Sequence, residues 1–196
     1  QITSAIAGEV VEGPFLSAKQ TVRDYRMEDR IEVRLGDGLQ ILSKEDEVTA
    51  VTICGMGGEL ISRILEAGSS GGHLNGQERL ILQPNVAEHF VREWLMKHSY
   101  CITHETVVED NHRLYEIIVA EPVNERVEYT ELELKYGPVL LKEPSELSVA
   151  KWNRMNRKNK EILEQLQKSK TPQNEKIAQF EKAFNELQGV IDRANS

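Results

Sequence analysis

The chain has 196 residues, of which 39% are hydrophobic and 29% are charged, and its formal net charge is −8. This length predicts one compact domain with a smaller appendage. No apolar run reaches the ~18 residues that a membrane-spanning helix needs, and the chain does not open on a secretory signal pattern. The two cysteines and five histidines lack the spacing of metal ligands or of a disulfide framework, so we expect a cytoplasmic protein without a bound metal.

The charge is divided unevenly along the chain. Residues 1–150 carry 14 positive and 26 negative side chains, whereas residues 151–196 carry 10 positive and 6 negative side chains. Five of the positive side chains fall within ten residues: Lys151, Arg154, Arg157, Lys158 and Lys160. A basic segment on an acidic protein indicates an anionic partner, although a solvated helix face explains the same charges equally well.

The first elements alternate between strand and helix. Residues 3–9 form a short apolar run that ends in an acid, and residues 13–26 place apolar side chains at helical spacing. Residues 30–35 alternate like a strand and lead into the turn Gly36-Asp37-Gly38. Residues 48–54 are a β-branched apolar run, which is typical of a strand buried on both faces of a parallel sheet.

The alternation continues to about residue 121. In order, we expect a glycine-rich turn, a helix over about 59–66, a loop, a strand over 79–83, a helix to about 98 and two strands over about 100–108 and 114–121. Alternating strands and helices predict a parallel sheet with right-handed crossovers. The last two strands have too short a link for a crossover, so they must be antiparallel. This pattern favours the S-adenosylmethionine methyltransferase variant of the Rossmann architecture over a dinucleotide-binding fold.

Residues 145–196 predict two amphipathic helices joined by a short break at residues 169–172, where Thr171 is the expected N-cap and Pro172 the first helical residue. Apolar positions follow 3-4 spacing in both helices: Trp152, Met155, Asn159, Ile162 and Leu166 in the first, and Ile177, Phe180, Phe184, Leu187 and Ile191 in the second. The short connection predicts an antiparallel coiled-coil hairpin, in which Asn159 would fix the register.

In open α/β sheets a ligand lies outside the carboxyl ends of the strands, and four strand ends here carry unusual residues. Glu9 can accept hydrogen bonds from the ribose hydroxyls of a nucleoside, or it is a solvated loop acid. Asp37 can accept from an adenine amino group, although Asp-Gly is also common in plain turns.

The other two strand ends are Gly55-Met56-Gly57-Gly58 and Gln83-Pro84-Asn85. The glycines allow positive φ and let a ligand approach the backbone, unless they only pack a helix against a strand. Pro84 stops its strand and exposes two amides that suit the edge of a nucleobase, although a plain strand stop explains the same residues.

Together these segments resemble the bacterial tRNA (adenine-N1)-methyltransferases that modify adenine 22 in the D-loop. The resemblance rests on AIAGEVVEGP at 5–14, LGDGL, GMGG, LILQPN, LYEI, YGP at 136–138 and the pair Lys151-Trp152. It implies S-adenosylmethionine as methyl donor, tRNA as substrate, a catalytic domain over residues 1–125 and a helical, tRNA-contacting domain over residues 126–196. The residues it assigns to the cofactor are Glu9, Val10, Asp37, Gly38, Leu39, Gly55, Met56, Gly57 and Gly58.

The chain departs from this family in one respect. Such methyltransferases begin with a strand and an acidic, glycine-containing loop, whereas this sequence starts at the expected second strand. We therefore expect one strand-loop-helix unit, about 30 residues or more, to be missing from it. If the polypeptide lacks that unit, we expect neither stable folding nor binding of S-adenosylmethionine.

Adenine N1 has a lone pair and no proton, so methylation there needs positioning and a negative local field more than a strong base. We expect Gln83, Pro84 and Asn85 at the target base, Tyr115 to stack on it, and Glu116 to supply part of the field, although Tyr115 and Glu116 could be an ordinary strand pair. Lys151, Arg154, Arg157, Lys158 and Lys160 would contact tRNA phosphates. The alternative function is a non-catalytic scaffold or partner protein that associates through the hairpin. For the enzyme we expect a monomer.

Overall fold

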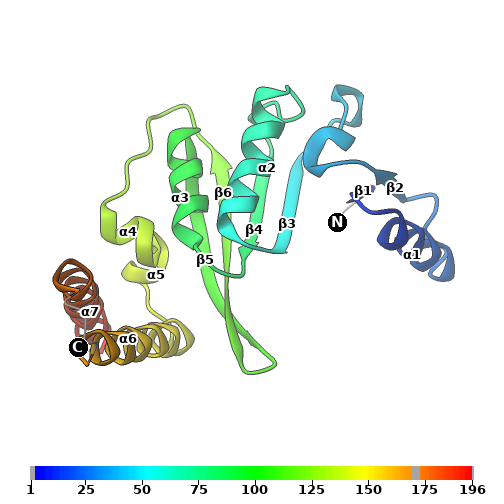
Figure 1. The fold of residues 1–196 in the computed structure, drawn as a ribbon. Coiled ribbons are helices and arrows are strands. Elements are labelled where there is room, and N and C mark those ends of the chain that lie inside the picture. The colour runs from blue at the N-terminus through cyan, green and yellow to red at the C-terminus, as the bar shows by residue number, and fades with distance from the viewer. Residues whose placement is uncertain (1–2, 169–172, 196) are drawn as a thin grey trace.

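The computed structural model describes residues 3–168 and 173–195, which form an α/β part followed by four helices (Figure 1). The first two strands, β1 (Ala5–Glu9) and β2 (Ile31–Leu35), pair in parallel and are connected by α1 (Glu12–Asp24). Two short 3-10 turns, η1 (Gly38–Ile41) and η2 (Lys44–Asp46), lead from β2 to the main sheet.

The main sheet has four strands in the order β3-β4-β6-β5. They are β3 (Ala50–Met56), β4 (Arg79–Pro84), β5 (Tyr100–Asp110) and β6 (Arg113–Pro122). The strands β3 and β4 are parallel, whereas β6 runs antiparallel to both β4 and β5. The predicted antiparallel hairpin that closes a mostly parallel sheet is therefore confirmed.

Two helices, α2 (Gly58–Ser70) and α3 (Glu88–Lys97), cover one face of this sheet (Figure 1). Their buried faces, which include Ile61 and Leu65 of α2 and Val91 and Leu95 of α3, are fully enclosed. These side chains recur at spacings of three and four residues, so each helix presents one apolar stripe to the strands.

The expectation that residues 48–54 are buried on both faces is wrong. The strand β3 begins at Ala50, and its burial alternates, with Val51 and Ile53 buried while Thr52 and Cys54 are exposed. In the part of the chain that the structure describes, α2 and α3 lie over the face that carries Val51 and Ile53, and the opposite face of β3 remains open.

The C-terminal part consists of α4 (Glu131–Tyr136), α5 (Pro138–Lys142), α6 (Glu146–Gln167) and α7 (Asn174–Ala194). Capping boxes at Thr130 and Ser145 fix the first turns of α4 and α6. A second hydrophobic core joins these helices to β5 and includes Val107, Tyr136, Leu140, Trp152, Leu187, Val190 and Ile191.

The helices α6 and α7 pack against each other in opposite directions, because Trp152 in the first half of α6 shares the second core with Val190 and Ile191 near the end of α7. Asn156, in the middle of α6, donates to Gln188 of α7 at 3.0 Å. Asn159 is only half-buried and Met155 is exposed, whereas Asn156 is buried, so the expected polar position in the contact is wrong by three residues. The expected break, with Thr171 and Pro172, lies outside the described residues. Within the described ranges, no helix is both long and apolar enough to span a bilayer.

Candidate active site

A glycine-rich turn after β3 forms the centre of the candidate site. Gly55 has φ +79°, and a Cβ added there would meet no described atom within 4 Å. Gly58 is required for a different reason, because its Cβ would collide with the Ala87 backbone, reaching 2.8 Å from the carbonyl carbon and closer still to the oxygen. The turn therefore borders open space at Gly55 and packs tightly on residues 85–88 at Gly58.

The amides of Gln83 and Asn85 hold this turn. The backbone N–H of Gly55 donates to Gln83 Oε1 at 2.8 Å, and Asn85 Nδ2 donates to the Gly55 carbonyl at 2.8 Å. Gln83 Nε2 in turn donates to Asn85 Oδ1 at 3.0 Å. Both side chains thus support the turn, and each keeps one further N–H for a ligand. Their contact with a nucleobase stays a prediction.

Backbone hydrogen bonds complete the junction between the two strand ends. Asn85 N–H donates to the Met56 carbonyl at 2.7 Å, and Gly58 N–H donates to the Val86 carbonyl at 2.8 Å. Pro84, which has no N–H, ends β4 and is buried. The ends of β3 and β4 are therefore one rigid unit.

An apolar rim borders this unit; its Met56 is among the residues predicted to hold the cofactor, whereas the sequence analysis missed Val86 and Phe90. Met56, Val86 and Phe90 are exposed hydrophobic side chains, and the His89 and Phe90 rings lie 4.3 Å apart. Val86 follows Gln83-Pro84-Asn85 directly and Phe90 comes four residues later, so their position after a strand end was the available signal. The ring of Phe90 can stack on a nucleobase, and Met56 and Val86 offer it apolar contacts.

The ends of β1 and β2, which carry Glu9 and lead into Asp37, lie beside each other, since the Gly36 N–H donates to the Glu9 carbonyl at 2.9 Å. Asp37 is exposed, and Gly38 has φ +54°. A groove of about 230 Å³ runs between Asp37–Gln40 and α2, where Leu60, Arg63, Ile64, Ala67 and Gly68 line it. The exposed Asp37 carboxylate beside this groove and the half-buried Glu9 at the neighbouring strand end fit the hydroxyl and amino donors of a nucleoside.

The remaining residues predicted to hold the cofactor differ in exposure. Val10 is highly exposed, whereas Leu39 is buried and its side chain fills the space above Gly68 in the main core. The side chain of Leu39 therefore serves packing, although the residue also lines the groove.

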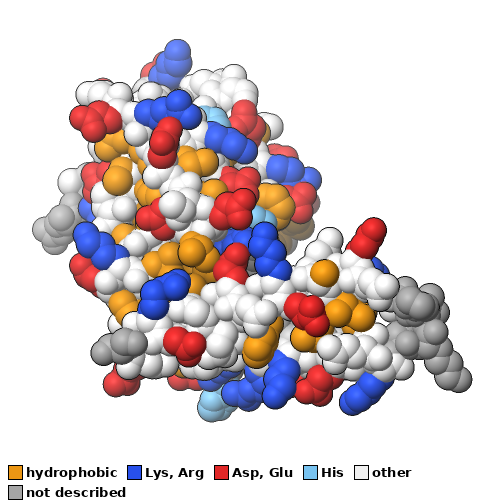
Figure 2. All heavy atoms as spheres, turned by 90° about the vertical axis from the view of Figure 1, so that its left-hand side faces the viewer, with side chains coloured by type: hydrophobic (Ala, Val, Ile, Leu, Met, Phe, Trp, Pro, Cys, Tyr) orange, Lys and Arg blue, Asp and Glu red, His pale blue; other side chains and the backbone are white. Residues whose placement is uncertain are grey.

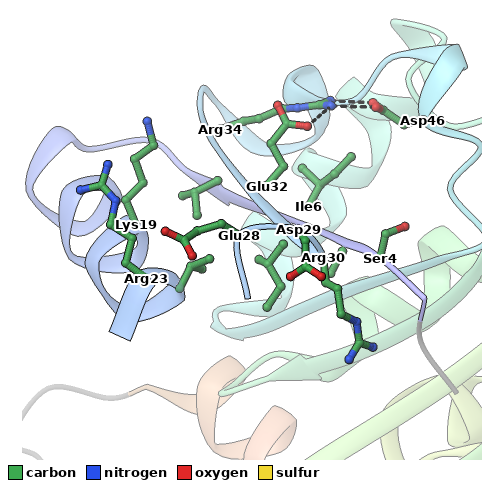
Figure 3. Close-up of a pocket in the computed structure, with 14 residues that line it drawn as sticks. Ser4, Ile6, Lys19, Arg23, Glu28, Asp29, Arg30, Glu32, Arg34 and Asp46 are labelled. Atoms are coloured by element: carbon green, nitrogen blue, oxygen red, sulfur yellow. Dashed lines mark hydrogen bonds and ion pairs between the residues drawn. The ribbon is translucent and has the colours of Figure 1, made fainter. Parts of the chain in front are cut away.

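A larger groove of about 590 Å³ lies elsewhere (Figure 3). It is lined by α1, by residues 4–6 at the start of β1, by residues 28–34 in and before β2, and by Asp46, whereas Glu9, Asp37 and Gly55–Gly58 do not line it. Arg34 on its wall is held by Glu32 and Asp46, at 2.7 and 2.6 Å. This groove is therefore separate from the candidate site.

Glu116 is buried, which corrects its predicted role as a source of negative field. Its carboxylate pairs with Arg92, and it accepts from Lys151 Nζ at 2.7 Å. Burial alone would raise the pKa of Glu116, but Arg92 and Lys151 outweigh it and hold that pKa below the ordinary value. Its charge is therefore neutralised within the protein. Tyr115 is half-buried opposite Val108 of β5.

The five basic residues divide into two groups. Lys151 has a side chain only 12% exposed and pairs with Glu88 and Glu116, so it is not available to a phosphate, and its predicted RNA contact is corrected. Arg154 is half-exposed and donates to the His112 carbonyl at 2.9 Å. Arg157, Lys158 and Lys160 are exposed. Figure 2 shows a group of Lys and Arg side chains along the lower edge of the helical pair.

A four-stranded sheet closed by an antiparallel hairpin has the glycine-rich turn at the end of β3, and the two acids lie at or just after the carboxyl ends of the parallel strands β1 and β2; together they define a Rossmann-like methyltransferase. The chain belongs to the tRNA (adenine(22)-N(1))-methyltransferase family, whose family model matches residues 1–189.

Relatives of known sequence or structure agree with this membership. A tRNA (adenine(22)-N(1))-methyltransferase of Bacillus subtilis is 41% identical, over 97% of this chain and 81% of its own length. The crystal structure of the Bacillus subtilis m1A22 tRNA methyltransferase superimposes with a TM-score of 0.85 at 39% identity, over 96% of this chain and 82% of that one. A Streptococcus pneumoniae structure in complex with S-adenosyl-L-methionine gives 0.86 at 38%, over 97% and 82%.

Proposed function

We propose that this protein transfers a methyl group from S-adenosylmethionine to N1 of adenine 22 in the D-loop of tRNA, as a cytoplasmic monomer. The observation that carries the proposal is the family match over residues 1–189, which spans the glycine-rich turn and both acidic strand ends. We assign catalysis to residues 1–125 and tRNA contact to the helical domain over residues 126–196.

S-adenosylmethionine supplies an electrophilic methyl group when it is bound. Glu9 and Asp37 would accept hydrogen bonds from its ribose and adenine, and Gly55–Gly58 would let the nucleoside approach the backbone. The open space at Gly55 and the groove beside Asp37 support this assignment.

The methionine part of the cofactor would need a further structural unit. Within the described residues, β1 pairs only with β2 and β3 only with β4, and Figure 1 places β3 at the edge of its sheet that faces β1 and β2. We propose that a parallel strand with a glycine-containing loop lies between β1 and β3 in the active protein. The exposed face of β3, with Thr52 and Cys54, supports the same proposal.

The chain's contribution to the reaction would be positioning. Adenine N1 attacks with an in-plane lone pair and releases no proton, so no side chain has to act as a strong base. Correct alignment of two reactants can supply ~7–11 kcal/mol of the barrier. The hydrogen-bonded unit of Gly55, Gln83 and Asn85 gives a rigid surface for such alignment, and the rim of Met56, Val86 and Phe90 would stack on the base.

The tRNA would lie on the exposed basic side chains of α6. Arg154, Arg157, Lys158 and Lys160 are partly or fully exposed, and their contacts to phosphates would be independent of sequence. The identity of the target base would then be read at the glycine-rich turn Gly55–Gly58, the catalytic turn. The antiparallel pair of α6 and α7 would act as a coiled-coil hairpin that extends the surface for tRNA.

The test is methylation of bulk tRNA followed by nucleoside mass spectrometry and mapping of the modified position. We expect 1-methyladenosine at position 22, and none in a tRNA that carries guanine there. Methylation at N6, or retained cofactor binding without any methylated nucleoside, would contradict the proposal, and the second outcome would favour a non-catalytic partner protein.

A further inference from the structure

We propose that Lys151 and Glu88 are positioning residues that hold the basic helix α6 at a fixed place relative to the catalytic turn. The inference rests on the proposed function and deepens it, because it states how a tRNA held on α6 would present its adenine to Gly55–Gly58. Neither residue would touch the reacting atoms.

Glu88 is tied rigidly to the turn. Two backbone hydrogen bonds join Asn85 and Val86 to the turn, at 2.7 and 2.8 Å. Ala87 then adopts a left-handed conformation, with φ +60°, and caps α3, whose first residue is Glu88. A displacement of Glu88 would therefore move the segment that holds the turn.

Lys151 is tied just as rigidly to the basic helix. It lies on α6 beside Trp152, which is 1% exposed and anchors α6 in the second hydrophobic core. Arg154 and Arg157 follow three and six residues later, about 4.5 and 9 Å further along the helix axis. Because these residues share one helix, the position of the Lys151 ammonium group sets the positions of the exposed cations.

Glu88 and Lys151 meet in a contact that is largely shielded from solvent. Lys151 Nζ donates to Glu88 and, at 2.7 Å, to Glu116, and the three side chains are 12%, 15% and 4% exposed. Ion pairs with this little solvent contribute less to net stability than to geometric specificity, because desolvation offsets much of the attraction. A geometric role thus accounts for charged residues where apolar ones would pack equally well.

The deeper half of the same network has a structural role. Arg92 is fully buried and pairs with Glu116 and, at 2.8 Å, with Glu105, which also accepts from the Val139 N–H of α5 at 2.8 Å. Removing Arg92 would leave the buried Glu105 without its cation and Glu116 with Lys151 alone. Replacing Glu88, in contrast, leaves Lys151 paired with Glu116, so this edge of the network can be changed without unfolding the protein.

The experiment compares Glu88→Gln and Lys151→Met with the control Glu93→Gln. Glu93 lies on the same helix, and among the described residues its ion pair is with Lys97, at 3.7 Å on the surface. For each variant, the dissociation constants for tRNA and for S-adenosylmethionine, the single-turnover rate constant at saturating tRNA, and the melting temperature are measured.

We expect the rate constant of Glu88→Gln and Lys151→Met to fall about 10- to 100-fold, as for a misplacement of about 1 Å, while tRNA affinity changes less than about threefold. Lys151→Arg and Glu88→Asp should recover part of the rate, which a merely structural role does not predict. The double variant should be no slower than Lys151→Met. A rate within twofold of wild type in Glu88→Gln, or a loss that only follows weaker binding or melting, overturns the proposal.

A second measurement does not depend on activity. Spin labels at Glu59 of α2 and Glu164 of α6, both exposed, in a background with both cysteines replaced by serine, report the distance distribution between turn and helix. It should broaden in Lys151→Met and stay unchanged in Glu93→Gln. If wild-type protein makes no 1-methyladenosine, the proposed function fails, whereas an unbroadened distribution in Lys151→Met contradicts the positioning role alone.

Discussion

Substitution of Gly58 by alanine tests how tightly the catalytic turn is packed on residues 85–88. The added Cβ would lie 2.8 Å from the Ala87 carbonyl carbon and 3.2 Å from the Val86 oxygen. Carbon atoms at contact need about 3.5–4.0 Å, so the loop would have to move by roughly 1 Å. Both neighbours are backbone atoms, so no side chain can rotate away.

The cost follows from either of two responses. If the loop deforms, overpacking costs about 1–3 kcal/mol. If it separates from the turn, the hydrogen bonds of Gly58 to Val86 and of Asn85 to Met56 are lost, at about 0.5–1.5 kcal/mol each. We therefore expect Gly58→Ala to lower the free energy of unfolding by about 1–3 kcal/mol in urea titrations.

The matched control is Gly13→Ala in the first turn of α1, where no described atom lies within 4 Å of the added Cβ. Alanine in place of a helical glycine should be neutral or raise the free energy of unfolding by up to about 1 kcal/mol. Equal urea midpoints for the two variants would refute the reasoning about Gly58, and unchanged affinity for S-adenosylmethionine in Gly58→Ala would separate the turn from cofactor binding.

Three further predictions concern the C-terminal helices and the β6 residue that contacts them. Arg157→Glu with Lys158→Glu should weaken tRNA binding and reduce the slope of log affinity against log salt by about 1.5–2, with affinity for S-adenosylmethionine unchanged; an unchanged salt slope would place tRNA elsewhere. The pKa of Glu116 in the folded protein lies below its ordinary 4.5. The contribution of its ionised form to stability is therefore complete above about pH 4.5 and is lost as the pH falls through the lower folded value. Urea midpoints measured from pH 6 to 3 should fall more steeply in wild type than in Glu116→Gln, and parallel profiles would contradict this. Gly137→Ala places a Cβ 2.6 Å from Glu105 Oε2 and 2.9 Å from Arg92 Nη2, at φ +93°. The substitution should lower the free energy of unfolding by at least about 1–3 kcal/mol. A thermal melt like that of wild type would show that α4 and α5 can shift.

The order and type of the first strands and helices could be predicted from sequence because each depends on local periodicity. The antiparallel hairpin of β5 and β6 followed from link length alone, since Asn111 and His112 leave no room for a crossover. The exposed face of β3 could not be predicted in this way. A run of β-branched residues indicates that a strand can be buried on both faces. Whether each face is covered depends on elements that are distant in the sequence.

The glycines show the same division between local and distant causes. The positive φ of Gly55 is a local property of a turn, and the cluster of glycines indicated it. The requirement at Gly58 comes from Ala87, and the requirement at Gly137 comes from Glu105 and Arg92. Only a folded structure brings these residues together, so the sequence could mark the positions without giving the reason.

Lys151 illustrates why charged residues in the candidate site were the hardest to assign. It lies in the same basic run as Arg154, Arg157 and Lys158, and helical spacing could not distinguish it from them. The residues that separate it are Glu88 and Glu116, which are 63 and 35 positions away. A basic side chain that pairs with buried carboxylates is held inside the protein, whereas one without such partners stays available for a phosphate. The basic run therefore contains both the exposed surface and the residue that fixes its position, and variants of Lys151 and of Arg157 should fail in different steps: alignment in the first case, binding in the second.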